Sequence, residues 1–146
     1  MTIFMELTAA KKATLFSLPR ARVAALCGTF MAKYLAPGKI EKTLTKLSKF
    51  GVEATQDEAK TAWEDILAVS GRARGENCLP RSISIFLLLF LRGKSCTWKS
   101  GVCHAPFAAH AWIEVGGIPV GETLDITRFL VIATTEETND WNKNEE

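Results

Sequence analysis

The sequence predicts an α+β fold in which a helical N-terminal half precedes one buried helix and a small antiparallel sheet. Three observations support this. Apolar residues recur at helical spacing up to about residue 69, the block 83–91 is apolar on nearly every side, and the chain then alternates like strands. The 146 residues fit one domain. We expect a helical region at 1–75, a region at 76–135 with the buried helix and sheet, and a polar, disordered tail at 136–146.

Four helical segments are expected in the first half, at 5–18, 20–36, 40–50 and about 57–69. Pro19 separates the first two, and Pro37-Gly38 closes the second. Thr55 or Asp57 can cap the last one with a side-chain oxygen. Turn-forming residues at 70–75 then end the helical half.

The second half should place one helix at the centre of the fold. Residues 76–81 open it, with Pro80 in the first turn, where a missing N–H costs nothing. It runs to about Arg92 and stops at Gly93. Strands are predicted at 97–103, 108–115, 118–122 and 129–134, with a turn at Gly116-Gly117 between the second and the third.

The composition narrows the class of protein. Hydrophobic residues make up 47% and charged residues 23% of the chain, which argues against disorder, collagen and coiled coil. A net charge of +2 without a lysine- or arginine-rich run argues against nucleic-acid binding. Because no membrane-length apolar stretch and no clean signal-cleavage site is found, we expect a cytoplasmic protein. Its four cysteines are too sparse for a disulfide scaffold.

Cys78 is the cysteine best placed for nucleophilic chemistry. A cysteine attacks as the thiolate, which the unpaired N–H groups and the positive dipole end of a helix start stabilise. Cys78 alone stands at a predicted helix start. Cys27 lies within an apolar helical segment, and Cys96 and Cys103 flank a predicted strand. The alternative interpretation of Cys78 is a small buried hydrophobic residue.

A nucleophilic cysteine needs a base, and the chain contains only two histidines, His104 and His110. His110 lies in a predicted strand whose alternation puts it on one face with Trp112 and Glu114. Small neighbours leave room around the imidazole, and Trp112 can shield it from water. A purely structural histidine is the alternative.

A third group should orient the imidazole, and the candidates are Glu122 and Asp125. A strict two-residue glycine loop places Asp125 on the face of His110. A longer loop or a bulge brings Glu122 there instead. Pro119 cannot donate to the ladder and favours a disturbed register, so both carboxylates stay open.

Two blocks of sequence carry a resemblance to a known family. Residues 78–82, CLPRS, open the apolar helix, and residues 106–122, PFAAHAWIEVGGIPVGE, follow in the strands. In this order and spacing they resemble the leader peptidases of lasso-peptide biosynthesis, which belong to the transglutaminase-like, papain-related cysteine enzymes. The resemblance covers about residues 76–134. It implies Cys78 as nucleophile and His110 as base. The family's usual aspartate falls on Glu122, one methylene longer, with Asp125 as the alternative.

The resemblance also implies partners. Some family members carry a strand-rich leader-binding domain, which the helical residues 1–75 do not match. The chain therefore resembles the stand-alone peptidase, whose substrate is a precursor peptide and which relies on a separate leader-binding protein. A macrocyclase would act next. No cofactor and no metal is implied.

Three other functions remain open. The same residues could pass an acyl group to an amine rather than to water. Cys96, Cys103, His104 and His110 offer metal-ligand chemistry, although their spacing lacks a close cysteine pair. A non-catalytic peptide-binding module is the third.

Overall fold

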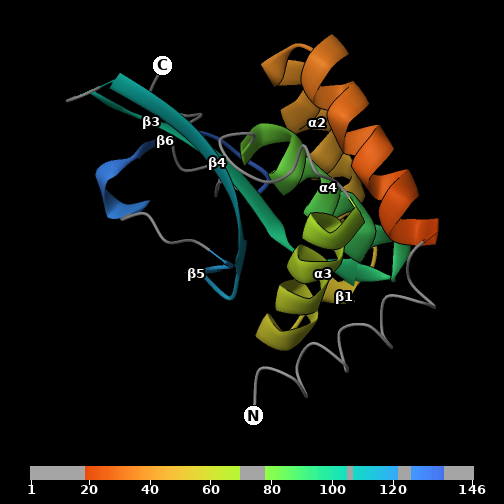
Figure 1. The fold of residues 1–146 in the computed structure, drawn as a ribbon. Helices are drawn as coiled ribbons and strands as arrows, with labels where there is room; N and C mark the ends of the chain where they lie inside the picture. The colour runs from red at the N-terminus through yellow and green to blue at the C-terminus, as the bar shows by residue number, and fades with distance from the viewer. Residues whose placement is uncertain (1–18, 70–77, 105–106, 122–125, 137–146) are drawn as a thin grey trace.

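The computed structural model describes residues 19–69, 78–104, 107–121 and 126–136, and it confirms the α+β fold (Figure 1). Helices lie on one side and an antiparallel four-stranded sheet on the other. In chain order the elements are a helix at 19–34, α2 (Pro37–Ser48), β1 (Val52–Glu53), α3 (Gln56–Val69), α4 (Cys78–Leu91), β2 (Lys94–Ser95), β3 (Thr97–His104), β4 (Phe107–Val115), β5 (Ile118–Pro119), η2 (Ile126–Arg128) and β6 (Leu130–Thr134).

The helices of the first half follow the predicted order. The segment predicted at 20–36 is helical at 19–34, and the one predicted at 5–18 lies outside the described residues. The preceding helix ends before Pro37, as predicted, and Pro37 also opens α2, three residues before the start predicted at residue 40. A proline fits the first helical position, where the backbone N–H would have no partner within the helix.

Thr55 caps α3 through a reciprocal pair of hydrogen bonds. The backbone N–H of Glu58 donates to the Thr55 hydroxyl at 3.2 Å, and the Thr55 N–H donates to the Glu58 carboxylate at 3.1 Å. This capping box satisfies two N–H groups that the helix itself leaves unpaired. It settles the prediction in favour of Thr55.

The four-stranded sheet has the order β5-β4-β3-β6. Strands β3 and β4 pair along their whole length, from Thr97 opposite Glu114 to His104 opposite Phe107. The predicted glycine turn is present, because Gly116 and Gly117 have φ values of +61° and +78°. The strand predicted at 118–122 is shorter than expected, since β5 ends at Pro119.

A second, parallel sheet was missed by the sequence analysis. It consists of β1 and β2, two residues each, with Val52 opposite Lys94 and Glu53 opposite Ser95. Gly51 does turn the chain, with φ +97°, and the Val52 N–H then bonds the Gly93 carbonyl at 3.1 Å. Strands this short show no alternation, so the pattern held no signal for them.

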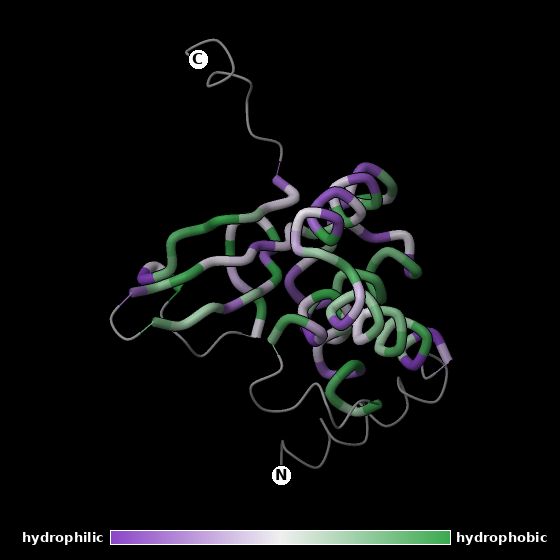
Figure 2. Tube along the Cα trace, turned by 90° about the horizontal axis from the view of Figure 1, so that it is seen from above, coloured by the Kyte–Doolittle hydropathy of each residue, from purple (hydrophilic) through white to green (hydrophobic). Residues whose placement is uncertain are grey.

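The core forms around α4, as its apolar sequence predicted. Every side chain from Ser82 to Leu89 is buried, and α4 packs against α3 and β4. Figure 2 shows the sheet on one side and the helices on the other, each with hydrophobic segments. Near the end of α4, Arg92 bonds the buried carboxylate of Asp65 at 2.6 Å, which ties α4 to α3.

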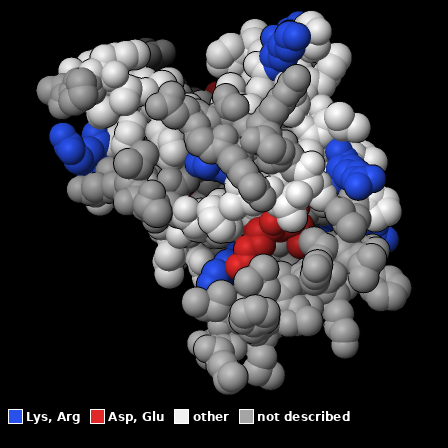
Figure 3. Space-filling model, viewed as in Figure 1, with Lys and Arg blue, Asp and Glu red and all other residues white. Residues whose placement is uncertain are grey.

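The outer side of the helix at 19–34 is apolar. Val23, Leu26, Phe30 and Tyr34 recur at helical spacing, and each is more than half exposed. On the face shown in Figure 3, the described lysines and arginines stand apart from one another. Within the described part of the chain, no helix has the length and apolar character needed to cross a membrane.

Candidate active site

Cys78 is the first residue of α4 and is half-buried. The first turn of α4 contains no acidic residue, so no carboxylate there offsets the positive end of the helix dipole. Two serine hydroxyls bond to backbone carbonyls of this turn. Ser82 donates to the Leu79 carbonyl at 2.9 Å, and Ser84 donates to the Pro80 carbonyl at 2.6 Å. The structure thus places Cys78 at the start of α4, the position that the sequence predicted for it.

A buried hydrogen bond fixes this end of α4 against the sheet. The indole N–H of Trp98 in β3 donates to the Ser82 hydroxyl at 3.0 Å. Cys78 lies four residues before Ser82, and residues at this spacing share one face of a helix. The face of α4 that carries Cys78 is therefore the face that meets β3.

His110 lies in β4, directly opposite Gly101 of β3, and is 8% exposed. Its ring stacks on Trp112 with centroids 5.9 Å apart and planes 17° apart. The ring of Phe129, which follows η2, lies 5.7 Å from His110. The predicted shielding of the imidazole by Trp112 is present, and Phe129 adds a second apolar ring that the sequence did not indicate.

The side chains of β4 alternate between the two faces of the sheet. Ala111, Ile113 and Val115 join the hydrophobic core around α4, and His110, Trp112 and Glu114 lie on the other face of the strand. The elements that carry Cys78 and His110 pack against each other. The alternation places the imidazole on the face of β4 opposite the residues that pack on α4.

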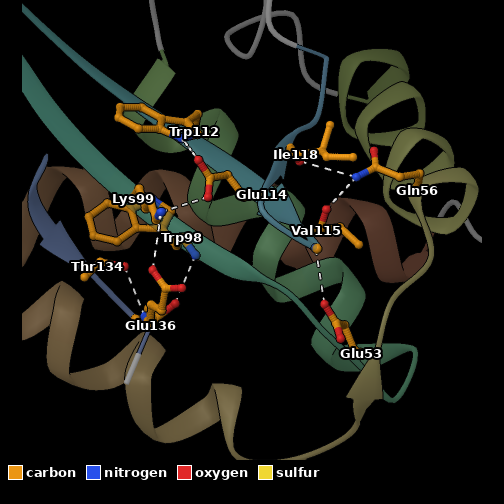
Figure 4. A network of polar contacts seen from close by, with 12 residues as sticks. Glu53, Gln56, Trp98, Lys99, Trp112, Glu114, Val115, Ile118, Thr134 and Glu136 are labelled. Atoms are coloured by element: carbon orange, nitrogen blue, oxygen red, sulfur yellow. Dashed lines mark hydrogen bonds and ion pairs between the residues drawn. The ribbon is translucent and has the colours of Figure 1, made fainter. Parts of the chain in front are cut away.

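A polar network lies on the His110 face of the sheet (Figure 4). Glu114, 8% exposed, accepts a hydrogen bond from the indole N–H of Trp112 at 3.0 Å. Its other carboxylate oxygen lies 2.9 Å from the ammonium of Lys99, which also lies 3.4 Å from Glu136. The bond to Glu114 raises the pKa of Lys99.

The two candidates for the third group, Glu122 and Asp125, lie outside the described residues. The hairpin before them follows the strict two-residue loop, because Val115 pairs with Ile118 and the Val120 N–H donates to the Ile113 carbonyl at 2.9 Å. Up to Val120, the register is thus the one that the sequence analysis linked to Asp125.

Cys96 is poorly suited to nucleophilic chemistry, and the arrangement of Cys96 and Cys103 does not fit one metal ion. Cys27, which the sequence placed in an apolar helical segment, is exposed. Cys96 is 6% exposed, and burial raises the pKa of its thiol well above the ordinary value. Cys96 and Cys103 stand at opposite ends of β3, about 23 Å apart at 3.3 Å per residue. Among the described residues, no three His, Cys, Asp or Glu side chains are grouped to hold a metal.

Comparisons with known proteins support the family relation on which the site prediction rests. The family model described as the transglutaminase-like superfamily matches residues 23–134. This range includes most of the helix at 19–34 as well as the sheet, and so extends beyond the two blocks that carried the resemblance. The curated proteins gave no match, and neither did the solved structures. The chain belongs to the transglutaminase-like superfamily.

Proposed function

We propose that this protein is a cysteine peptidase that removes the leader from the precursor of a lasso peptide. One observation carries the proposal. A half-buried cysteine opens the central helix of a transglutaminase-like domain, and that helix packs against the strand holding a buried, ring-stacked histidine. The superfamily includes cysteine peptidases and acyltransferases. The two sequence blocks around Cys78 and His110 favour the leader peptidases within it.

In the proposed reaction, the Cys78 thiolate attacks the carbonyl carbon at the leader–core junction. The N–H groups at the start of α4 stabilise the developing oxyanion. Collapse of the tetrahedral adduct breaks the C–N bond, and His110 gives its proton to the departing amine of the core. Water then attacks the thioester while His110 takes up its proton. The products are the leader carboxylate and the core with a free N-terminal amine, and the Cys78 thiolate and protonated His110 are restored.

The proposal includes two partners. A separate leader-binding protein presents the precursor, because the described first half consists of helices and one two-residue strand and resembles no strand-rich binding module. A macrocyclase would use the released N-terminal amine of the core. Localisation in the cytoplasm remains part of the proposal.

The first experiment measures cleavage. The purified protein is incubated with the precursor peptide encoded beside it and with the leader-binding protein, and mass spectrometry follows the products. Cys78→Ala and His110→Ala should each abolish cleavage, whereas His104→Gln, at the exposed histidine of β3, should cleave normally. Cleavage by Cys78→Ala would refute the proposal.

The same assay assigns the third group. Glu122→Gln and Asp125→Asn are compared, and one of them should strongly impair cleavage. If both variants cleave normally, another group orients His110. The product masses also separate the alternative chemistry, because transfer to an amine gives an amide in place of the leader carboxylate.

A bridging reagent tests whether the two proposed catalytic side chains meet. Dibromoacetone reacts first with a thiolate and then with a second nucleophile within reach of its three carbons. We expect a peptide cross-link between Cys78 and His110 in the wild-type protein and none in His110→Ala. Attachment at Cys78 without a cross-link would show that the two groups do not meet.

A further inference from the structure

The position of Trp112 is set by a buried acceptor. Trp112 is 1% exposed, and its indole N–H donates to Glu114 at 3.0 Å. A buried indole N–H without an acceptor would be destabilising by the full free energy of its desolvation. This bond therefore strongly favours one orientation of the ring. The neighbours of the ring leave little other space, since a Cβ on Gly101 would lie only 3.2 Å from Cη2 of Trp112.

Glu114 is itself held in place. Its second oxygen lies 2.9 Å from Lys99, whose side chain is 18% exposed, so both carboxylate oxygens have partners. Lys99 also reaches Glu136 at 3.4 Å. A carboxylate 8% exposed is costly unless it is paired in this way. The ammonium therefore holds the Glu114 carboxylate in place beneath the indole (Figure 4).

The oriented indole faces His110. A nearly parallel ring at 5.9 Å presents its electron-rich face to the imidazole, and this stacking holds the plane of the imidazole ring. In a cysteine enzyme the imidazolium is the form that pairs with the thiolate. A tilted or mobile indole would weaken the stacking and admit water to the ring.

We infer that Glu114 is a positioning residue, which with Lys99 fixes Trp112 so that the indole holds the imidazole ring of His110 in place. The effect of Glu114 on catalysis rests on the proposed function. Its effect on the positions of Trp112 and His110 does not depend on that function. Glu114 touches neither the thiol nor the peptide in this scheme. It acts through the indole.

Nuclear magnetic resonance tests the geometry without any substrate. The chain has two histidines, so the ring signals of His110 are assigned by comparison with His104→Gln. The ring current of Trp112 should displace the His110 signals in the wild type. Glu114→Ala should remove most of that displacement, and Glu114→Gln, whose amide oxygen still accepts the indole N–H, should retain it. Unchanged His110 signals in a folded Glu114→Ala protein would overturn the inference.

Trp112→Phe provides a second route if Glu114→Ala does not fold. It keeps a ring but removes the only hydrogen bond that joins the indole to Glu114. We expect the His110 signals to change, and adding Glu114→Gln to this variant should change them no further. Retention of the wild-type His110 signals in Trp112→Phe/Glu114→Gln would overturn the inference.

The chemical consequence is measured as the rate of alkylation of Cys78 by iodoacetamide at neutral pH, read from its own peptide by mass spectrometry. We expect about a fivefold decrease in Glu114→Ala and little change in Glu114→Gln. With the precursor as substrate, kcat should fall in parallel and KM should stay the same. Normal alkylation in Glu114→Ala would overturn this consequence. If the wild-type protein does not cleave the precursor, but the variants show these changes in the His110 signals and in alkylation, only the peptidase proposal is refuted.

Discussion

The indole N–H of Trp98 donates to the Ser82 hydroxyl at 3.0 Å, in the buried contact between β3 and α4. The same hydroxyl donates to the Leu79 carbonyl in the first turn of α4. Ser82 therefore joins the helix start that carries Cys78 to the strand that pairs with His110. These two hydrogen bonds link the first turn of α4, which begins with Cys78, to the sheet.

Ser82→Ala should destabilise the protein by about 1–3 kcal/mol, because the buried indole N–H of Trp98 loses its acceptor. Urea denaturation measures this loss. Thr43→Ala is the matched control, since the Thr43 hydroxyl makes a bond to a carbonyl of its own helix at an exposed site. The control should change stability by less than about 0.5 kcal/mol. Equal effects of the two substitutions would contradict the role assigned to Ser82.

Periodicity predicted the fold where elements are long and their surroundings uniform. The apolar block at 83–91 placed α4 at the centre, and the alternation around His110 placed Trp112 and Glu114 on its face. The two-residue strands β1 and β2 carry no such pattern, because their pairing depends on a chain turn and on contacts distant in sequence.

Gly101→Ala should destabilise the sheet and disturb the rings beside His110. A Cβ at this position would lie 2.8 Å from the Leu130 carbonyl oxygen and 3.2 Å from Trp112. We expect a loss of about 1–3 kcal/mol by urea denaturation, as in other overpacked sites. Changed His110 signals in magnetic resonance should accompany it.

Gly38→Ala is the control for added volume without a clash. Gly38 lies in α2, and nothing lies within 4 Å of a Cβ placed there. Because alanine favours helix more than glycine, this variant should be neutral or up to about 1 kcal/mol more stable. If Gly101→Ala were as stable as Gly38→Ala, the close packing at Gly101 would not constrain the site.

Gly121, just after the β4–β5 hairpin, lies close to Trp63 of α3. Its φ is +66°, and a Cβ there would lie 2.8 Å from the ring of Trp63. Gly121→Ala should therefore combine the cost of positive φ with a steric clash. Gly117→Ala, with φ +78° and open space around it, bears only the first cost, about 1–2 kcal/mol.

The difference between these two variants isolates the contact with Trp63. We expect Gly121→Ala to be less stable than Gly117→Ala by about 1–3 kcal/mol in urea. Cleavage should also fall more in Gly121→Ala, since Gly121 directly precedes the candidate carboxylates in the sequence. Equal stability of the two variants would show that Trp63 yields to the added methyl group.

The candidate site was predictable in part. A cysteine at a helix start and a histidine flanked by small residues are local patterns, so the sequence alone was enough to propose Cys78 and His110 as site residues. The tilted ring contact between Phe129 and His110 and the pairing of Lys99 with Glu114 join segments that are separated in the chain. No short-range pattern encodes such contacts, because they depend on the order and register of the strands.

Glu58→Gln should reduce the dependence of stability on pH below neutrality. The Thr55 N–H, and also the ammonium of Lys94 at 3.3 Å, hold the pKa of Glu58 below its ordinary value of 4.5. A carboxylate whose pKa is lower in the folded state stabilises the protein above the unfolded value. That contribution disappears as the pH falls from about 4.5 through the folded value.

Urea denaturation at several pH values between 7 and 3 measures this contribution. Glutamine keeps an oxygen that can accept the Thr55 N–H but cannot titrate, so Glu58→Gln should lose less stability on acidification than the wild type. Glu64→Gln, at an exposed position of the same helix, should lose as much as the wild type. If the Glu58 and Glu64 variants lost stability equally with pH, the capping box would not depend on the charge of Glu58.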